Sequence, residues 1–168
     1  MSKSYVHYGS KHFDKDKFEP IKNRGWGNKP IGGFWASPTD TLRGWKEFND
    51  WERIAKCNDD NAVTFTIDDT ARVLPLHNKE DYEWMAERYG FLVDLDPPFP
   101  PVMHYDFERI AHDFDVIDFK IGHEMSRLMY GWDCDCILVL NPDVVCEAPP
   151  EYAYEQETLE FTEEIESL

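Results

Sequence analysis

Apolar and polar residues alternate along several short stretches of the chain, and this pattern predicts β-strands. The clearest case is Val63-Thr64-Phe65-Thr66-Ile67, which alternates as expected for a strand with one buried face. Ile137–Leu140 is wholly apolar and is therefore predicted to be buried on both faces. The other predicted strands are short and bounded by turn residues: Ser4–Tyr8, Gly32–Ala36, Ala71–Leu76 and Val116–Phe119.

The longest predicted helix begins at Ser37-Pro38-Thr39-Asp40, where Ser37 would cap and Pro38 would take the first helical position. It is expected to run to about Lys56. Its apolar residues predict one face packed in the core: Leu42, Trp45, Phe48, Trp51 and Ile54 or Ala55. Further helices are predicted from Asn78 to a stop at Gly90, around Tyr105–Ala111 and near Gly122–Tyr130.

Because helices and strands interleave without a repeat, the fold class predicted is a single α+β domain. It is expected to cover residues 1–146 and to be followed by an acidic tail, 147–168. With 168 residues, 42% of them apolar and 15% aromatic, the chain can bury a core without a disulfide or metal. Residues 9–31 carry no periodic pattern and read as a long loop, and loops of this length are usually functional.

The net charge of −17 is unevenly distributed. Residues 1–30 hold seven Lys/Arg against three acids, whereas residues 147–168 contain eight Glu and no Lys or Arg. This acidity disfavours direct nucleic-acid binding, although it would suit a mimic of nucleic acid, and the basic segment suits a small phosphorylated ligand. There is no run of 18 apolar residues and no apolar signal-peptide core, so we expect no membrane partner and a cytoplasmic location.

Four cysteines, Cys57, Cys134, Cys136 and Cys146, are expected to be reduced and to act as small buried hydrophobic residues. Cys134-x-Cys136 is one residue shorter than the usual C-x-x-C knuckle and has no second pair, so no zinc site is predicted. Walker, dinucleotide-fingerprint, nucleophile-elbow and H-E-x-x-H motifs are also absent.

Three segments carry residues that suit the cleavage of an N-glycosidic bond to nicotinamide. The first strand ends in His7-Tyr8-Gly9-Ser10, where a histidine can bond a sugar hydroxyl and glycine permits close backbone approach. The segment Gly32–Ser37 contains Phe34 and Trp35, and a flat aromatic side chain can stack on a ring. Trp132–Pro142 places acids at the entry of a buried strand, where a carboxylate can support an oxocarbenium-like centre.

The order His-x-Gly-Ser, Gly-Gly-Phe-Trp-Ala-Ser and an acid before a hydrophobic strand resembles the ADP-ribosyltransferase superfamily. The likeness is greatest to its histidine-type branch of diphtheria-like toxins, poly-ADP-ribose polymerases and small phage or bacterial transferases. It implies a split mixed β-sheet around a central NAD-binding cleft with flanking helices. It also implies that His7 binds the nicotinamide-side ribose. Tyr8 stands between His7 and Gly9 here, whereas many members read His-Gly-Thr.

The resemblance implies a mono-ADP-ribosyltransferase that cleaves NAD and modifies a macromolecular acceptor, more readily a protein than a nucleic acid. Its catalytic residues would be His7 with Asp133 or Asp135, Asp135 being preferred narrowly and Glu124 standing next, although the family usually has Glu at the strand entry. The NAD-binding residues would be Tyr8, Gly9, Ser10, Phe34, Trp35 and Ser37, with the pyrophosphate near the basic loop, residues 11–29. Two alternatives remain open: a non-enzymatic acidic inhibitor that mimics nucleic acid, and a catalytically degenerate NAD or ADP-ribose binder.

Overall fold

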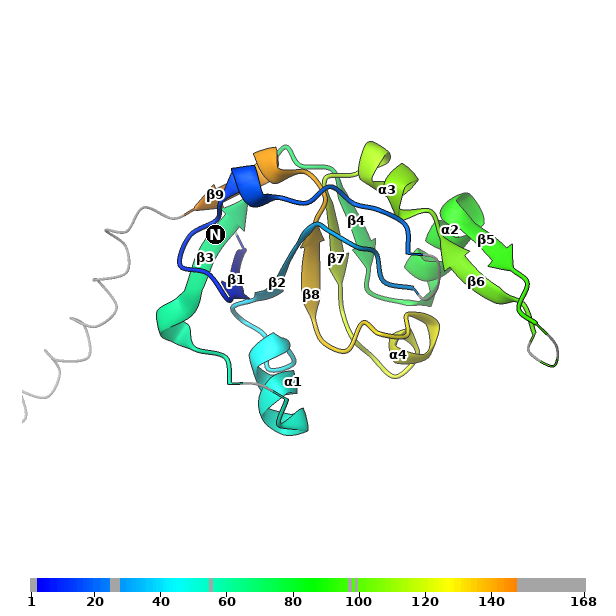
Figure 1. Cartoon of the computed structure of the whole chain (residues 1–168), viewed down its shortest axis with the longest axis horizontal. Coiled ribbons are helices and arrows are strands. Elements are labelled where there is room, and N and C mark those ends of the chain that lie inside the picture. Colours follow the sequence, from blue (N-terminus) through cyan, green and yellow to red (C-terminus); the bar gives the residue numbers. More distant parts are fainter. Residues whose placement is uncertain (1–2, 25–27, 55, 97, 99, 148–168) are drawn as a thin grey trace, which may run out of the picture.

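A seven-stranded mixed sheet forms the centre of the molecule, in the order β4-β7-β8-β2-β1-β3-β9 (Figure 1). The computed structural model describes residues 3–24, 28–54, 56–96, 98 and 100–147. The strands of this sheet are β1 (Ser4–Tyr8), β2 (Phe34–Pro38), β3 (Ala62–Ile67), β4 (Val73–Leu76), β7 (Val116–Phe119), β8 (Cys136–Val139) and β9 (Val145–Glu147). Within it only β4 and β7 pair in parallel. A separate antiparallel hairpin joins β5 (Gly90–Val93) to β6 (Val102–Tyr105).

In the described part of the chain, four α-helices accompany the sheet: α1 (Trp45–Glu52), α2 (Lys79–Tyr89), α3 (Phe107–Asp113) and α4 (Met125–Leu128). Short 3-10 turns lie at 15–17, 59–61 and 142–144. The helices α2, α3 and α4 supply Met85, Ile110 and Met125 to the larger core cluster, on the sheet face that carries Leu138. The opposite face holds a smaller cluster around Phe65, Ile137 and Val139. None of the described helices is long and apolar enough to cross a membrane.

Several predicted elements are confirmed, and the mixed α+β class with them. The strands β1, β3, β7 and β8 lie where alternation or an apolar run predicted them, and β2 and β4 overlap the predicted ranges. The helix α2 starts after Asn78, whose side chain accepts a hydrogen bond from the Asp81 backbone N–H, and it ends before Gly90, as predicted. The β5–β6 hairpin and β9 were not predicted.

The start of the first helix was predicted wrongly. Ser37 and Pro38 belong to β2, where they pair with Val6 and Tyr5 of β1, and the helix α1 begins eight residues after Ser37. Ser37 nevertheless caps it from a distance, because the Trp45 backbone N–H donates to Ser37 Oγ at 2.8 Å. Strand pairing therefore overrode a local capping signal.

The apolar stripe of this helix was also predicted wrongly as a core face. Leu42, Trp51 and Ile54 are 90%, 78% and 64% exposed, and only Phe48 packs partly against the larger cluster. Trp51 lies within the helix but on a side that stays exposed, and Leu42 and Ile54 lie outside the helix. Ala55 lies outside the described residues.

The predicted bounds of two helices and the predicted burial of two cysteines also need correction. Tyr105 belongs to β6 rather than to a helix, and the helix predicted near 122–130 shortens to α4. The four cysteines are free, but only Cys134 and Cys136 are buried, whereas Cys57 is half-buried and Cys146 is exposed. The proposed tail begins at Glu147, which ends β9, and 148–168 lie outside the described residues.

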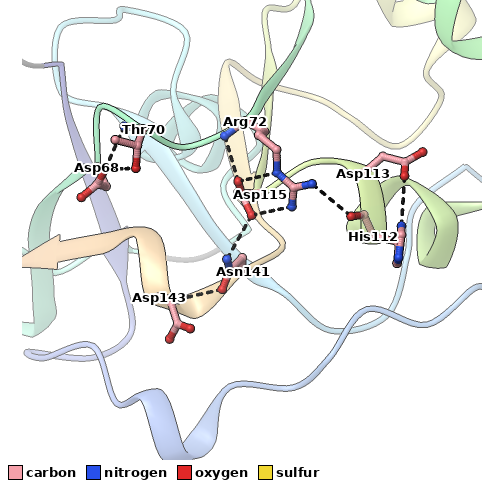
Figure 2. A network of polar contacts seen from close by, with 8 residues as sticks. All are labelled: Asp68, Thr70, Arg72, His112, Asp113, Asp115, Asn141 and Asp143. Atoms are coloured by element: carbon pink, nitrogen blue, oxygen red, sulfur yellow. Dashed lines mark hydrogen bonds and ion pairs between the residues drawn. The ribbon is translucent and has the colours of Figure 1, made fainter.

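One carboxylate holds three strand ends together at the end of the sheet drawn in Figure 2. Asp115 precedes β7 and accepts hydrogen bonds from the Arg72 backbone and guanidinium at 2.8–3.0 Å, and from Asn141 Nδ2 at 3.0 Å (Figure 2). Arg72 precedes β4 and Asn141 follows β8. The Arg72 side chain lowers the pKa of Asp115 well below its usual range, so the carboxylate stays charged.

Gly33 allows the chain to enter β2 against the core. Its φ of +71° is a left-handed conformation, and a Cβ there would lie 2.5 Å from Leu138 Cδ1 and 2.9 Å from the Val139 carbonyl oxygen. We expect Gly33→Ala to lower the free energy of unfolding by about 1–3 kcal/mol, measured by urea denaturation. Gly122→Ala is the matched control, because nothing lies within 4 Å of its Cβ position. Equal stability of the two variants would contradict the prediction.

Candidate functional site

The sheet opens between β1 and β2. These strands pair only at Tyr5–Pro38 and Val6–Ser37, whereas β1 pairs with β3 along all five of its residues. Beyond Val6 a side chain spans the gap, because His7 Nδ1 donates to the Trp35 carbonyl oxygen at 2.6 Å. A side-chain bond thus replaces backbone pairing where the two strands separate.

A cavity of about 260 Å³ lies at this opening, beside the N-terminus of α1. Its walls combine residues from β1, β2, β8, the first residue of α1 and two connecting segments, and several of them are aromatic. They are Val6, His7, Tyr8, Lys29, Trp35, Ala36, Ser37, Trp45, Trp132, Asp133, Cys134 and Cys136. The structure therefore brings five of the predicted site residues to one cavity: His7, Tyr8, Trp35, Ser37 and Asp133.

The alternation of side chains along β1 divides the predicted residues between the two faces of the sheet. Tyr8 shares the α1 face with Val6, and burial raises the pKa of its hydroxyl, which therefore remains protonated at neutral pH. The ring of His7 is directed to the other face, where its centroid lies 4.3 Å from that of Phe34. The side chain of Tyr8, directly before Gly9, thus faces the cavity. His7 chiefly joins β1 to β2.

Phe34, Gly9 and Ser10 are not brought to this cavity. Phe34 packs on Phe65 of the smaller core cluster, and Gly9 donates its N–H to the Asn61 carbonyl oxygen at 2.8 Å. Ser10 and Phe34 instead line a second hollow of about 320 Å³ with residues of the basic loop, including His12 and Lys17. The basic loop therefore contributes to both spaces, because Lys29 is part of the wall of the cavity.

Trp132 fixes the aromatic wall and the end of the basic loop. It is almost fully buried, its ring lies edge-on to Trp35 at 4.8 Å, and its Nε1 donates to the Asn28 carbonyl oxygen at 2.7 Å. Lys29, which follows Asn28, places its Nζ 4.6 Å from the Trp35 ring centroid. An ammonium group is thereby held at the rim of an aromatic cavity.

The two candidate acids have different surroundings. Asp133 is exposed and lines the cavity. Asp135 is 5% exposed, and its carboxylate accepts hydrogen bonds from Thr41 Oγ1 at 2.6 Å and from the Ile121 N–H at 2.8 Å. The geometry favours Asp133 as the acid available to a ligand. Glu124 is exposed just before α4 and does not line the cavity.

Asp135 and Ser37 instead position α1 over the cavity. Asp135 holds Thr41, and its own N–H donates to the Arg43 carbonyl oxygen at 2.7 Å, which anchors the segment before the helix. Ser37 accepts from the backbone N–H of Trp45. Together these bonds place the Trp45 side chain in the cavity wall.

A smaller polar hollow of about 190 Å³ continues the cavity past Tyr8 and Trp45. The two hollows share Val6, Tyr8, Ser37 and Trp45, and the second adds Thr39, Thr41, Thr64, Lys46 and Glu47. Lys46 forms an ion pair with Asp59 at 2.7 Å. The aromatic cavity is therefore next to a hollow lined by side-chain hydroxyl groups.

Sequence reasoning did not identify Lys29, Trp45, Trp132 or the two cysteines as cavity residues. The contact with Cys136 lowers the pKa of the Cys134 thiol, and the same contact together with burial raises that of Cys136. The only signal for Lys29 was the basic composition of its loop. Trp45 was assigned to a core stripe.

No group of three or more His, Cys, Asp or Glu side chains in the described part of the chain could hold a metal ion. No family model, curated protein or solved structure matches this chain.

Proposed function

We propose that this cavity binds the nicotinamide and ribose of NAD⁺ and that the protein is a mono-ADP-ribosyltransferase acting on a protein acceptor. One observation carries the proposal: three segments more than 20 residues apart in sequence, each singled out by its chemistry, meet at one cavity where two strands separate.

The chemistry of the cavity wall fits a flat, positively charged ring. Trp35, Trp45, Trp132 and Tyr8 offer π-faces, and aromatic enclosures recognise such cations. Lys29 at the rim suits a phosphate, and the adjoining polar hollow provides room for the part of a dinucleotide that 260 Å³ does not hold.

In the reaction, a nucleophile of the acceptor bonds to the anomeric carbon of the ribose as the bond to nicotinamide breaks, and nicotinamide leaves as a neutral molecule with the bonding electron pair. The aromatic walls orient the ring and exclude water, and Lys29 pairs with phosphate. The Asp133 carboxylate stabilises positive charge as it develops at the ribose, as carboxylates do in glycoside cleavage. His7 keeps β1 and β2 at a fixed separation through its bond to Trp35.

A degenerate binder is the second candidate, and the state of Asp135 favours it. The Asp135 carboxylate, the one nearest β8, already accepts hydrogen bonds from Thr41 and Ile121 and pairs with Arg43, which leaves a single, shorter carboxylate at Asp133 where the family usually has Glu.

Incubation with NAD⁺ labelled in the nicotinamide, with and without cell extract, tests the proposal. We expect release of free nicotinamide, and transfer of label from adenine-labelled NAD⁺ to a protein. Lys29→Gln should weaken NAD⁺ binding in calorimetry, whereas Lys56→Gln, an exposed lysine beyond α1, should not. Binding without release would support the degenerate binder, and absence of both would refute the assignment and leave the inhibitor.

A further inference from the structure

Another hollow lies at the β4 edge of the sheet, whereas the cavity lies near the middle of the sheet, at β8, β2 and β1. It has a volume of about 450 Å³, within the range of small-ligand sites, and it is formed by β4, α2 and the residue that follows α3. Its walls are Leu74, Pro75, Glu80, Asp81, Trp84 and Phe114. The strand β4 is three places from β2 in the sheet, so this groove is separate from the proposed NAD⁺ site.

Aromatic rings and carboxylates combine in this groove. Trp84 is more than a third exposed, and its ring lies edge-on to Phe114 with centroids 6.1 Å apart. The Glu80 carboxylate forms no hydrogen bond or ion pair within the described part of the chain, and the Asp81 carboxylate uses one oxygen to accept from the His77 N–H. An unpaired carboxylate beside partly exposed aromatic rings is complementary to a cation.

The molecule already contains one example of the expected contact. The guanidinium carbon of Arg88, one helical turn after Trp84, lies 4.1 Å from the centroid of the Trp84 ring. A planar guanidinium stacks on an aromatic face and pairs with a carboxylate at the same time, which an ammonium does less well.

The adjacent sheet edge does not favour addition of a strand. Lys120 and Val116 of the β7 region donate to the Leu76 and Arg72 carbonyl oxygens, so the backbone groups of Val73 and Pro75 point to the open edge. Proline has no N–H, and it therefore interrupts the hydrogen-bonding pattern that an added strand would need. Recognition at this place depends on a side chain rather than on backbone pairing.

We propose that the groove formed by Trp84, Phe114, Glu80 and Asp81 binds an arginine side chain of a partner protein. Charge complementarity selects this occupant, because the surface of the protein is strongly acidic and the groove contains acids and aromatic rings. The inference is independent of any activity at the NAD⁺ cavity.

The test is an NMR titration of the full chain with a blocked pentapeptide containing two arginines, against the same peptide with citrulline in their place. Citrulline keeps the shape and removes the charge. We expect the Trp84 indole N–H, assigned with Trp84→Phe, to shift with the arginine peptide, and the citrulline peptide to bind at least about fivefold more weakly. Glu80→Gln should weaken arginine binding by about threefold.

Glu52→Gln is the matched control for charge, because Glu52 is exposed on α1 and forms no ion pair in the described structure. Trp51, 78% exposed, is the matched control for the aromatic ring, and its indole signal should stay unchanged. Equal binding of the two peptides would overturn the proposal. So would equal losses in Glu80→Gln and Glu52→Gln, because they would show only general attraction to an acidic protein.

Discussion

Asp133→Asn is expected to reduce nicotinamide release from NAD⁺ by roughly 10²–10³-fold, equivalent to about 3–4 kcal/mol of transition-state stabilisation. The substitution keeps the size of the side chain and removes its charge. Affinity for NAD⁺ should change far less, because the carboxylate matters chiefly once positive charge develops at the ribose. Steady-state release and calorimetric binding, measured on the same preparation, separate the two effects.

Asp135→Asn is the comparison variant. Because the Asp135 carboxylate holds Thr41 and Ile121 and is buried, its loss should lower stability more than turnover per folded molecule. Full turnover in Asp133→Asn with loss in Asp135→Asn would reverse this assignment. Full turnover in both would place the acid elsewhere, with Glu124 the next to examine.

Asp115→Asn is expected to lower the free energy of unfolding at pH 7 by about 2–3 kcal/mol, because hydrogen bonds to a charged group are lost at a buried position. In the native protein the Asp115 carboxylate accepts hydrogen bonds from the Arg72 guanidinium. In the Asp115→Asn variant, the amide NH₂ group would face these same donors (Figure 2). Asp69→Asn, an exposed turn residue, is the control.

The pH dependence of stability provides a second readout for Asp115. Its pKa is lowered in the folded state, so its contribution is complete above the ordinary pKa of about 3.9 and is lost as the pH falls toward the folded value. The native protein should therefore lose stability below about pH 4 more steeply than Asp115→Asn does. Parallel acid limbs in urea denaturation at several pH values would contradict the role given to this carboxylate.

Local sequence determined the elements whose pattern agrees with their burial. The strand β3 alternates and is half-buried, β8 is wholly apolar and buried, and α2 carries its own cap at Asn78 and its own stop at Gly90. In such segments local preference and tertiary environment favour the same structure. The hairpin β5–β6 was missed because Gly90 was interpreted only as a helix stop and the following prolines as a break.

The place of α1 was decided by the sheet. Ser37-Pro38 has the composition of a helix start, but pairing with β1 extends the strand through both residues, and the helix begins at Trp45. The periodic apolar residues near it then face solvent at Leu42, Trp51 and Ile54. Periodicity indicates which residues share a face and does not reveal whether another element covers that face.

The chemical types at the candidate site were readable from the sequence, because His7, Tyr8, Trp35 and Asp133 stand in segments whose composition suggested a shared role. Only the tertiary structure decided which of them face the same space. The alternation of β1 turns Tyr8 rather than the ring of His7 to the α1 face, and the bonds to Thr41 and Ile121 occupy Asp135 and leave Asp133 available. The physical reason is that strand pairing and burial are set by residues far away in sequence, such as Val63, Thr41 and Ile121, whose positions no local pattern specifies.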